Sequence, residues 1–313
     1  MNLGIKEINS HPTHTYSIVA RDPSTGEMGV GVQSHYFSVG SVVDWGRSGV
    51  GVVATQSFVN KSFGLLGLEL MEQGKTPDEA LRYLLSDDEG REVRQVALLD
   101  YKGRVAVHTG SKCIKYAGHV IGENYSVQAN MMLTDKVWPA MAFAFENSKG
   151  LPLPEKIIKV LEAAESEGGD IRGKQSAALL IVKGESLKNK WDDPVIDIRV
   201  EDHDEPLKEL NRLLKLWRAY ENMDKGDIAM EKGDISEALK EYNAAREKVP
   251  NNVEMRYWTA ISLANSNRIN DALPMFTEVF NADNNWRILT ERLPEVGLLK
   301  VSKEELKEIL KLT

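Results

Sequence analysis

The chain has 313 residues, of which 42% are hydrophobic and 27% are charged, which is typical of an ordinary soluble globular protein long enough for two domains. A formal net charge of −8 argues against a general affinity for the phosphate backbone of nucleic acids. The single cysteine, Cys113, excludes an internal disulfide framework, and no segment approaches the roughly 18 apolar residues of a membrane span. The first residues also lack the apolar core of a signal peptide. We therefore expect a cytoplasmic protein that binds neither nucleic acid nor a membrane.

Short β-prone runs dominate the first part of the chain, at residues 15–20, 28–34 and 50–55. Their many glycines indicate β-bulges or close approach of the backbone to a neighbouring element. A helix is expected over residues 64–71. A second begins after Thr76, because Pro77 stands at its first position and Glu79 completes a capping box with Thr76.

Strands and helices then follow one another as far as residue 200. Residues 94–100 and 104–109 predict a hairpin around a Tyr-Lys-Gly turn, and residues 125–129 predict another strand. Helices are expected at about 134–148 and 153–167, and the last strands at 175–182 and 195–200. Because strands, helices and strands alternate in blocks, we expect layered α+β packing and not an alternating βαβ barrel.

Beyond residue 202 the sequence is helical and carries a weak repeat of 34 residues, the period of tetratricopeptide units. The first unit has six marker positions, namely Gly226, Gly233, Ala238, Tyr242, Ala245 and Pro250. The second has Ala260, Asn267, Ala272, Phe276, Val279 and Asn284, of which about three match. A generic helical bundle is the alternative. A stable array of such repeats usually needs at least three units, and this chain has two. We therefore expect the helical part to dock on the preceding domain or on a second subunit of a homo-oligomer, or to bind a protein partner.

Several common functional motifs are missing from the sequence. There is no phosphate-binding loop, no complete dinucleotide fingerprint, no HExxH, no CxxC and no GxSxG. His11 and His14 form an isolated pair without further ligands, which is a weak metal signal. We expect no cofactor and no metal.

Ordered sequence blocks between residues 15 and about 215 resemble an uncharacterised family labelled "domain of unknown function 1028", placed in the N-terminal-nucleophile (Ntn) hydrolase superfamily. The resemblance begins with the run TYSIVARDP that starts at Thr15 and continues with GEMGV from Gly26. It extends through the following blocks: VATQS at 53–57, REVRQV at 91–96, HTG at 108–110, GH at 118–119, VQANM at 127–131, GDIRGKQSA at 169–177 and DIRVEDH at 197–203.

The resemblance implies a four-layer αββα sandwich and a defined catalytic scheme. In that superfamily the mature chain begins with Thr, Ser or Cys, whose free amine acts as base for its own side chain, since its pKa of about 8 lies near physiological pH. Thr15 matches this first position, but fourteen residues precede it. The expected division is therefore a leader at 1–14, an Ntn-hydrolase-like domain at 15–206 and a tetratricopeptide-like helical domain at 207–313. Cleavage between His14 and Thr15 would free the amine.

Other polar residues are candidates for the same site. Asn130 is a candidate oxyanion donor, or else a turn residue, and Asp22 a candidate electrostatic partner of Thr15, or else a turn cap. Ser17 shares a strand face with Thr15. The remaining candidates for substrate binding follow strands or lie in a glycine-flanked loop, where a structural role is the alternative: Ser34, His35, Gln56, Asn60, Asp170 and Arg172.

Two classes of function are consistent with these patterns. The first is an amidohydrolase that cleaves a small amide or peptide bond through Thr15 after processing. The second is a non-catalytic binding protein that retains the sandwich and uses its helices for partners. An enzyme that relies on His35 or Asp170 without a free Thr15 amine is a third possibility, and the mass of the purified chain separates the first from the others.

Overall fold

The computed structural model describes residues 12–312, which divide into two compact units. The first unit ends at Arg212 and the second begins at Leu213, so the division falls inside the long helix α5 (Pro206–Glu231). Each unit has its own buried core and is described by itself. Among the described residues, no helix is long and apolar enough to cross a membrane.

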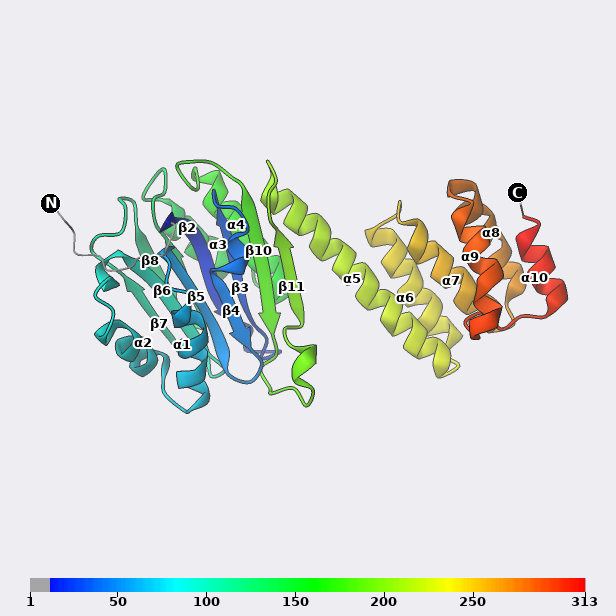
Figure 1. Cartoon of the computed structure of the whole chain (residues 1–313), viewed down its shortest axis with the longest axis horizontal. Coiled ribbons are helices and arrows are strands. Elements are labelled where there is room, and N and C mark those ends of the chain that lie inside the picture. The colour runs from blue at the N-terminus through cyan, green and yellow to red at the C-terminus, as the bar shows by residue number, and fades with distance from the viewer. Residues whose placement is uncertain (1–11, 313) are drawn as a thin grey trace. The chain divides into compact units, whose positions relative to one another are not determined.

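The first unit contains two antiparallel sheets (Figure 1). The strands of one run in the order β1-β5-β6-β7, with β4 also paired to β5. Their bounds are Pro12–Thr13 for β1, Asp44–Arg47 for β4, Gly51–Phe58 for β5, Arg94–Asp100 for β6 and Val105–Thr109 for β7. The β6–β7 pair confirms the predicted hairpin. The short strands β1 and β4 were not predicted from the sequence.

The second sheet has six strands in the order β11-β10-β3-β2-β9-β8. Their bounds are Thr15–Arg21 for β2, Met28–Ser34 for β3, Gly118–Gly122 for β8, Tyr125–Ala129 for β9, Ser176–Val182 for β10 and Ile196–Val200 for β11. Strand β2 lies in the middle of this sheet, and its first residue, Thr15, is paired with Ser34 at the end of β3. The register therefore brings the beginning of one central strand beside the end of another.

Helices cover the outer face of each sheet, which gives four layers in the order helix, sheet, sheet, helix. Helices α1 (Ser62–Glu72) and α2 (Pro77–Ser86) pack on the β5–β6–β7 region, and the predicted capping box of Thr76 and Glu79 opens α2. Helices α3 (Val137–Glu146) and α4 (Leu153–Ser166) pack on the other sheet. Short 3₁₀ turns occur at Val39–Ser41, Arg91–Val93 and Lys190–Asp192.

Apolar side chains fill most of the space between the two sheets. Alternate residues of β3, among them Val30 and Val32, meet Val52 and Ala54 of β5, because successive strand residues point to opposite faces. On the outer face of β3 a glycine replaces a side chain. A Cβ on Gly31 would lie 2.2 Å from Cγ2 of Ile157 in α4, so this glycine allows the helix to approach the sheet closely.

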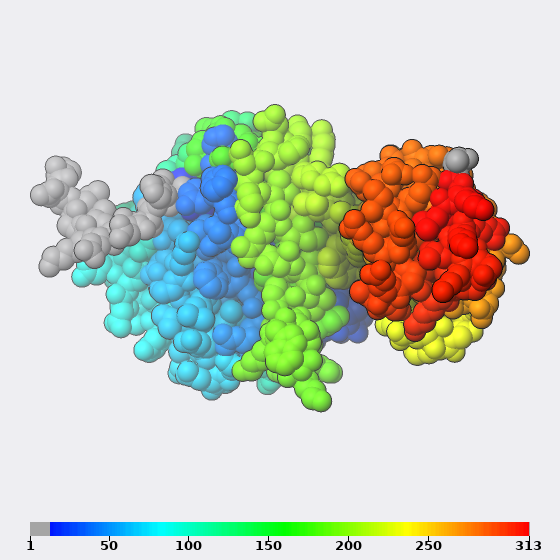
Figure 2. Space-filling view, turned by 45° about the vertical axis from the view of Figure 1, so that its right-hand side comes forward, coloured from blue at the N-terminus to red at the C-terminus, as the bar shows by residue number. Residues whose placement is uncertain are grey.

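The second unit consists of helices, in agreement with the sequence. They continue from α5 through α6 (Ile235–Lys248), α7 (Val253–Asn265), α8 (Ile269–Ala282), α9 (Asn285–Arg292) and α10 (Lys303–Leu310), with a 3₁₀ turn at Leu293–Val296. Helices α8 to α10, orange to red, form a continuous surface of this unit (Figure 2). Its core contains Tyr242, Phe276 and several alanines, all fully buried. The Tyr242 ring would lie only 2.4 Å from a Cβ on Gly226, so a small residue here allows two helices to approach.

Candidate functional site

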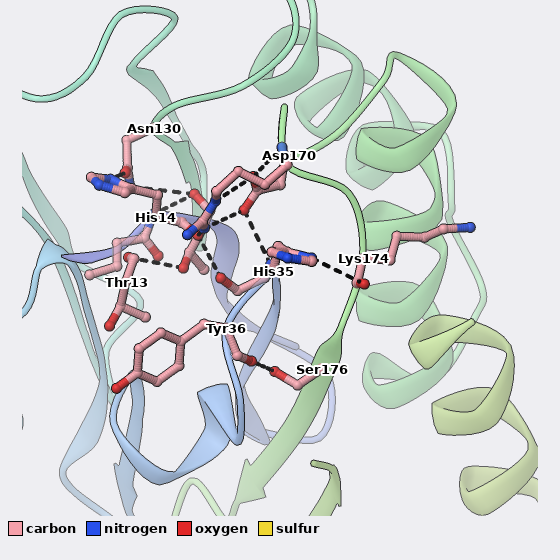
Figure 3. A network of polar contacts seen from close by, with 12 residues as sticks. Thr13, His14, His35, Tyr36, Asn130, Asp170, Lys174 and Ser176 are labelled. Carbon is pink, nitrogen blue, oxygen red and sulfur yellow. Dashed lines mark hydrogen bonds and ion pairs between the residues drawn. The ribbon is translucent and has the colours of Figure 1, made fainter. Parts of the chain in front are cut away.

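The peptide bond between His14 and Thr15 lies where the chain passes from one sheet to the other. Strand β1 pairs with β5 in the first sheet, and β2 begins at Thr15 in the second. His14 stands between them, and both it and Thr15 are buried. Polar side chains from both sheets and from the loop before β10 surround this peptide (Figure 3).

Two side-chain donors converge on the carbonyl oxygen of His14. The Ser34 hydroxyl donates to it at 2.5 Å, and Nη2 of Arg172 donates at 2.9 Å. Ser34 is in position because its strand places it opposite Thr15. A carbonyl with a hydroxyl and a guanidinium donor is polarised more strongly than one in a simple strand ladder.

The Arg172 guanidinium is fixed by the carboxylate of Asp170. Its Nε lies 3.0 Å from Oδ1 and its Nη2 lies 2.7 Å from Oδ2, a two-point contact with the planar carboxylate. The same carboxylate accepts the backbone N–H of Arg172 at 2.9 Å and that of His35 at 3.2 Å. The Asp170 side chain is 0% exposed and that of Arg172 is 27% exposed. The buried carboxylate therefore holds the partly exposed guanidinium group in one position.

The His14 side chain is held in a closed polar and aromatic environment. Its Nδ1 lies 2.8 Å from Oδ1 of Asn130, and its ring meets that of Phe58 edge to face at 5.6 Å between centroids. The amide nitrogen of Asn130 donates to Gln95, so its oxygen is the acceptor and His14 Nδ1 carries the proton. Burial lowers the pKa of His14 below its usual value, which keeps the ring neutral at neutral pH.

Thr15 is hydrogen bonded through both its hydroxyl and its carbonyl. The hydroxyl donates to the carbonyl oxygen of Thr13 at 3.0 Å. The carbonyl oxygen of Thr15 accepts the backbone N–H of Asn130 at 3.1 Å and the side-chain amide of Gln56 at 3.3 Å.

A buried network of amide side chains continues from this peptide into the space between the sheets. Ser17 donates to Gln56 at 2.6 Å and accepts from Gln128 at 2.7 Å. The amide of Gln56 donates to Gln95 at 2.7 Å, and Gln95 also receives the amide of Asn130 at 2.9 Å. Such a network rigidifies the residues around a site when its members are satisfied.

The structure brings together most of the residues selected from sequence. Those within the connected group are Thr15, Ser17, Ser34, His35, Gln56, Asn130, Asp170 and Arg172. Sequence reasoning missed Gln95 and Gln128. A polar residue inside each of the apolar strand runs at 94–100 and 125–129 was the signal that could have found them.

Two selected residues lie elsewhere. Asp22 follows the far end of β2, about 23 Å along the chain from Thr15 at the usual rise per residue, and its carboxylate accepts from Ser24 in the turn. It also lines a surface cavity of about 1150 Å³ beside the turns that join β8 to β9 and α3 to α4. Asn60 lies two residues before α1, where its Oδ1 accepts the backbone N–H of Ser62 at 3.1 Å. Neither side chain contacts Thr15.

No group of three or more His, Cys, Asp or Glu residues suited to a metal occurs in the part of the chain that the structure describes. The polar donors at the His14 carbonyl are instead hydroxyl and guanidinium groups, which stabilise negative charge on oxygen. Chemically, the arrangement is suited to attack on a carbonyl.

The protein has a mixed α/β fold with antiparallel sheets, followed by a helical extension. Residues 15–210 match the family of unknown function DUF1028, and the chain belongs to this family. The crystal structure of protein SPO2555 from Silicibacter pomeroyi, which carries the same family designation, is 31% identical. It matches with a TM-score of 0.58, covering 65% of this chain and 85% of that one. A comparison with curated proteins finds no match.

Proposed function

We propose that this chain is the precursor of an amidohydrolase of the N-terminal-nucleophile class, with Thr15 as its nucleophile. The observation that carries the proposal is the pair of donors on the His14 carbonyl oxygen, at 2.5 Å from Ser34 and 2.9 Å from Arg172. Attack on this carbonyl would convert its oxygen into an oxyanion. Fixed donors at that oxygen commonly contribute about 3 kcal/mol to such a step.

Processing follows from the position of the Thr15 hydroxyl. The hydroxyl donates to the Thr13 carbonyl, and the lone pairs of its oxygen are available to attack the His14 carbonyl carbon. A bond forms between Thr15 Oγ1 and that carbon, the carbon–nitrogen bond breaks, and the hydroxyl proton passes to the nitrogen. Water then hydrolyses the ester. The products are a leader that ends in the His14 carboxylate and a chain that begins with the Thr15 amine.

The released amine then serves as base for the Thr15 hydroxyl in the hydrolysis of a small amide or peptide. The hydroxyl attacks the substrate carbonyl, the substrate amine leaves with a proton, and water releases the acid from the resulting ester. Ser34 and Arg172 are again available as donors, because the carbonyl that they hold in the precursor leaves with the leader. Asn130 positions the strand through the Thr15 carbonyl.

The layered packing supports this assignment. An order of helix, sheet, sheet and helix is the one expected of an Ntn-hydrolase sandwich, and the nucleophile of that class opens a central strand, as Thr15 opens β2. The family match also begins at Thr15. Residues 12–14 thus precede the region shared with the family.

For the second unit we propose tetratricopeptide-like repeats that bind a protein partner or a second copy of the chain. Gly233 and Asn267 both have positive φ, at 77° and 59°, and stand one 34-residue period apart in turns between helices. The interlocking positions Tyr242 and Phe276 share the same spacing and are fully buried. Residues 34 apart that share backbone conformation and packing role are what a repeated structural unit predicts.

A non-catalytic binding protein is the rival function. It is favoured by the burial of Thr15 and by the hydrogen bonds that hold its hydroxyl and its carbonyl oxygen. Under that alternative the chain would remain intact, and its helical unit would provide the activity.

Intact-mass spectrometry of the purified chain separates the two. We expect wild type to lose residues 1–14, Thr15→Ala to keep its full mass, and Thr15→Ser to be processed. Thr25→Ala is the matched control, because Thr25 is an exposed turn residue. A full-length mass for wild type, with no difference from Thr15→Ala in any amidase assay, would remove the hydrolase proposal.

A second arm tests the donors themselves. Arg172→Met keeps the unbranched apolar stem of the side chain and removes the guanidinium group, and we expect processing to slow by about 10²–10³-fold. Arg212→Met, at an exposed ion pair with Glu209, is the control and should process normally. If Arg172→Met processes as fast as wild type, the carbonyl donors are structural.

A further inference from the structure

Residues 12–14 lie against a binding surface formed by other residues of the first unit. Strand β1 lies along the edge of β5, with Pro12 opposite Phe58 and Thr13 opposite Ser57. Main-chain pairing of this kind is how an extended peptide adds to a sheet edge. The segment leading to the Thr15 nitrogen is therefore bound in the manner of a peptide ligand.

The side chain of the last residue in that segment has its own enclosure. His14 is 2% exposed, with its ring edge-on to Phe58 and its Nδ1 2.8 Å from the Asn130 amide oxygen. Its carbonyl is held by Ser34 and Arg172. The ring and the carbonyl of His14 are thus recognised by separate groups, and the main chain of the two residues before it pairs with β5.

Building on the proposed function, we infer that this surface is the acyl-side subsite of the mature enzyme and that it takes an extended peptide with histidine at the cleaved bond. The leader in the precursor and the substrate in the mature protein must present their carbonyl to the same Thr15 hydroxyl and the same two donors. The residue that supplies the carbonyl therefore lies where His14 lies. The substrate class is a histidyl peptide or amide, hydrolysed with one water to a histidyl carboxylate and an amine.

The hydrogen bond to Asn130 provides the discrimination. A neutral ring that donates through Nδ1 satisfies the buried amide oxygen, whereas a methyl or phenyl side chain leaves it unpaired. The loss of such a bond corresponds to about a tenfold change in rate. The same reasoning applies to the leader in the precursor and to the peptide in the mature enzyme.

The test uses the processed wild-type protein and three fluorogenic amides, acetyl-Pro-Thr-His, acetyl-Pro-Thr-Ala and acetyl-Pro-Thr-Phe coupled to aminomethylcoumarin. We expect kcat/KM for the histidyl amide to exceed that of the other two by about tenfold or more. In parallel, His14→Ala and His14→Phe precursors should process about tenfold more slowly than wild type, while His203→Ala, an exposed histidine outside the site, should process normally.

The outcomes are distinct. If wild type is processed but the three amides are hydrolysed equally and the His14 variants mature at the wild-type rate, the subsite inference is wrong and the hydrolase proposal stands. A phenylalanyl amide as good as the histidyl one would overturn the role of Asn130. A wild-type chain that is never processed would sink the proposed function, and the subsite with it.

Discussion

The carboxyl group of Asp44 is buried at the start of β4, and neither of its oxygens has a hydrogen-bond partner among the described residues. Loss of solvation raises its pKa from 3.8 to about 7, although the nearby Arg199 guanidinium acts in the opposite direction. An acid whose pKa is higher in the folded state than in the unfolded state binds its proton more tightly when folded. Its contribution to stability is therefore complete below about pH 4 and is lost as the pH rises through about 7.

We predict that Asp44→Asn stabilises the protein at pH 8 and has little effect at pH 4.5. A shift of about three pKa units corresponds to about 4 kcal/mol of free energy of unfolding as an upper bound. Urea denaturation at several pH values measures the difference between wild type and variant. Asp204→Asn, at an exposed acid, is the control. A variant whose stability differs from wild type by the same amount at both pH values would contradict a titrating Asp44.

At the scale of elements, the contact between β3 and α4 depends on glycine. The position of a Cβ at Gly31, 2.2 Å from Ile157, cannot be accommodated without moving either the side chain or the helix. Since α4 also supplies Glu165, which accepts the Tyr16 hydroxyl at 2.6 Å, the helix is tied to β2 as well as to β3. Displacement of α4 would thus be transmitted to the strand that begins with Thr15.

Gly31→Ala should therefore lower the free energy of unfolding by about 1–3 kcal/mol through overpacking. The double variant Gly31→Ala with Ile157→Ala removes the Cγ2 methyl group that faces the new methyl group, so the two changes together should cost less than their sum. Chemical denaturation of Gly31→Ala, of the double variant and of Ile157→Ala alone completes the cycle. Strict additivity of the two single changes would show that these residues are not in conflict.

Sequence reasoning worked well for elements with local signals. The capping box at Thr76 and Glu79 and the hairpin at Arg94–Asp100 and Val105–Thr109 are formed as expected. It also anticipated that the glycines of β3 allow close approach. The strands β4 and β8 and the two residues of β1 were missed, because short segments with glycine or proline acquire strand geometry only from pairing with β5 or β9.

At the scale of the whole molecule, the two units have separate cores. Buried residues of the helical unit, such as Phe276 and Tyr257, pack within that unit, and those between the sheets pack within the other. The boundary expected from sequence lies at residue 206/207, whereas compactness places it at 212/213, inside α5. A continuous helix gives no local sign of where one unit ends.

Separate cores predict separate responses to mutation. Phe276→Ala removes a fully buried ring and should destabilise the helical unit by about 3–5 kcal/mol. Hydrogen–deuterium exchange read by mass spectrometry should show faster exchange in α7 and α8, with β2 and β3 unchanged, and Thr15 processing should proceed normally. Equal loss of protection in β2 would indicate one cooperative unit.

Local sequence signals were enough to predict the class of each long element, the helical character of the last third and the strand that begins at Thr15, because periodicity, caps and turns act over a few residues. Which polar groups meet depends on the folding of distant segments onto one another. Arg172 reaches a carbonyl 158 residues away, Ser34 faces Thr15 through sheet register, and Asp22 is carried to the opposite end of the same strand. These contacts depend on the pairing of strands that lie far apart in the sequence and on the packing of two whole sheets. A short stretch of sequence carries no information on either.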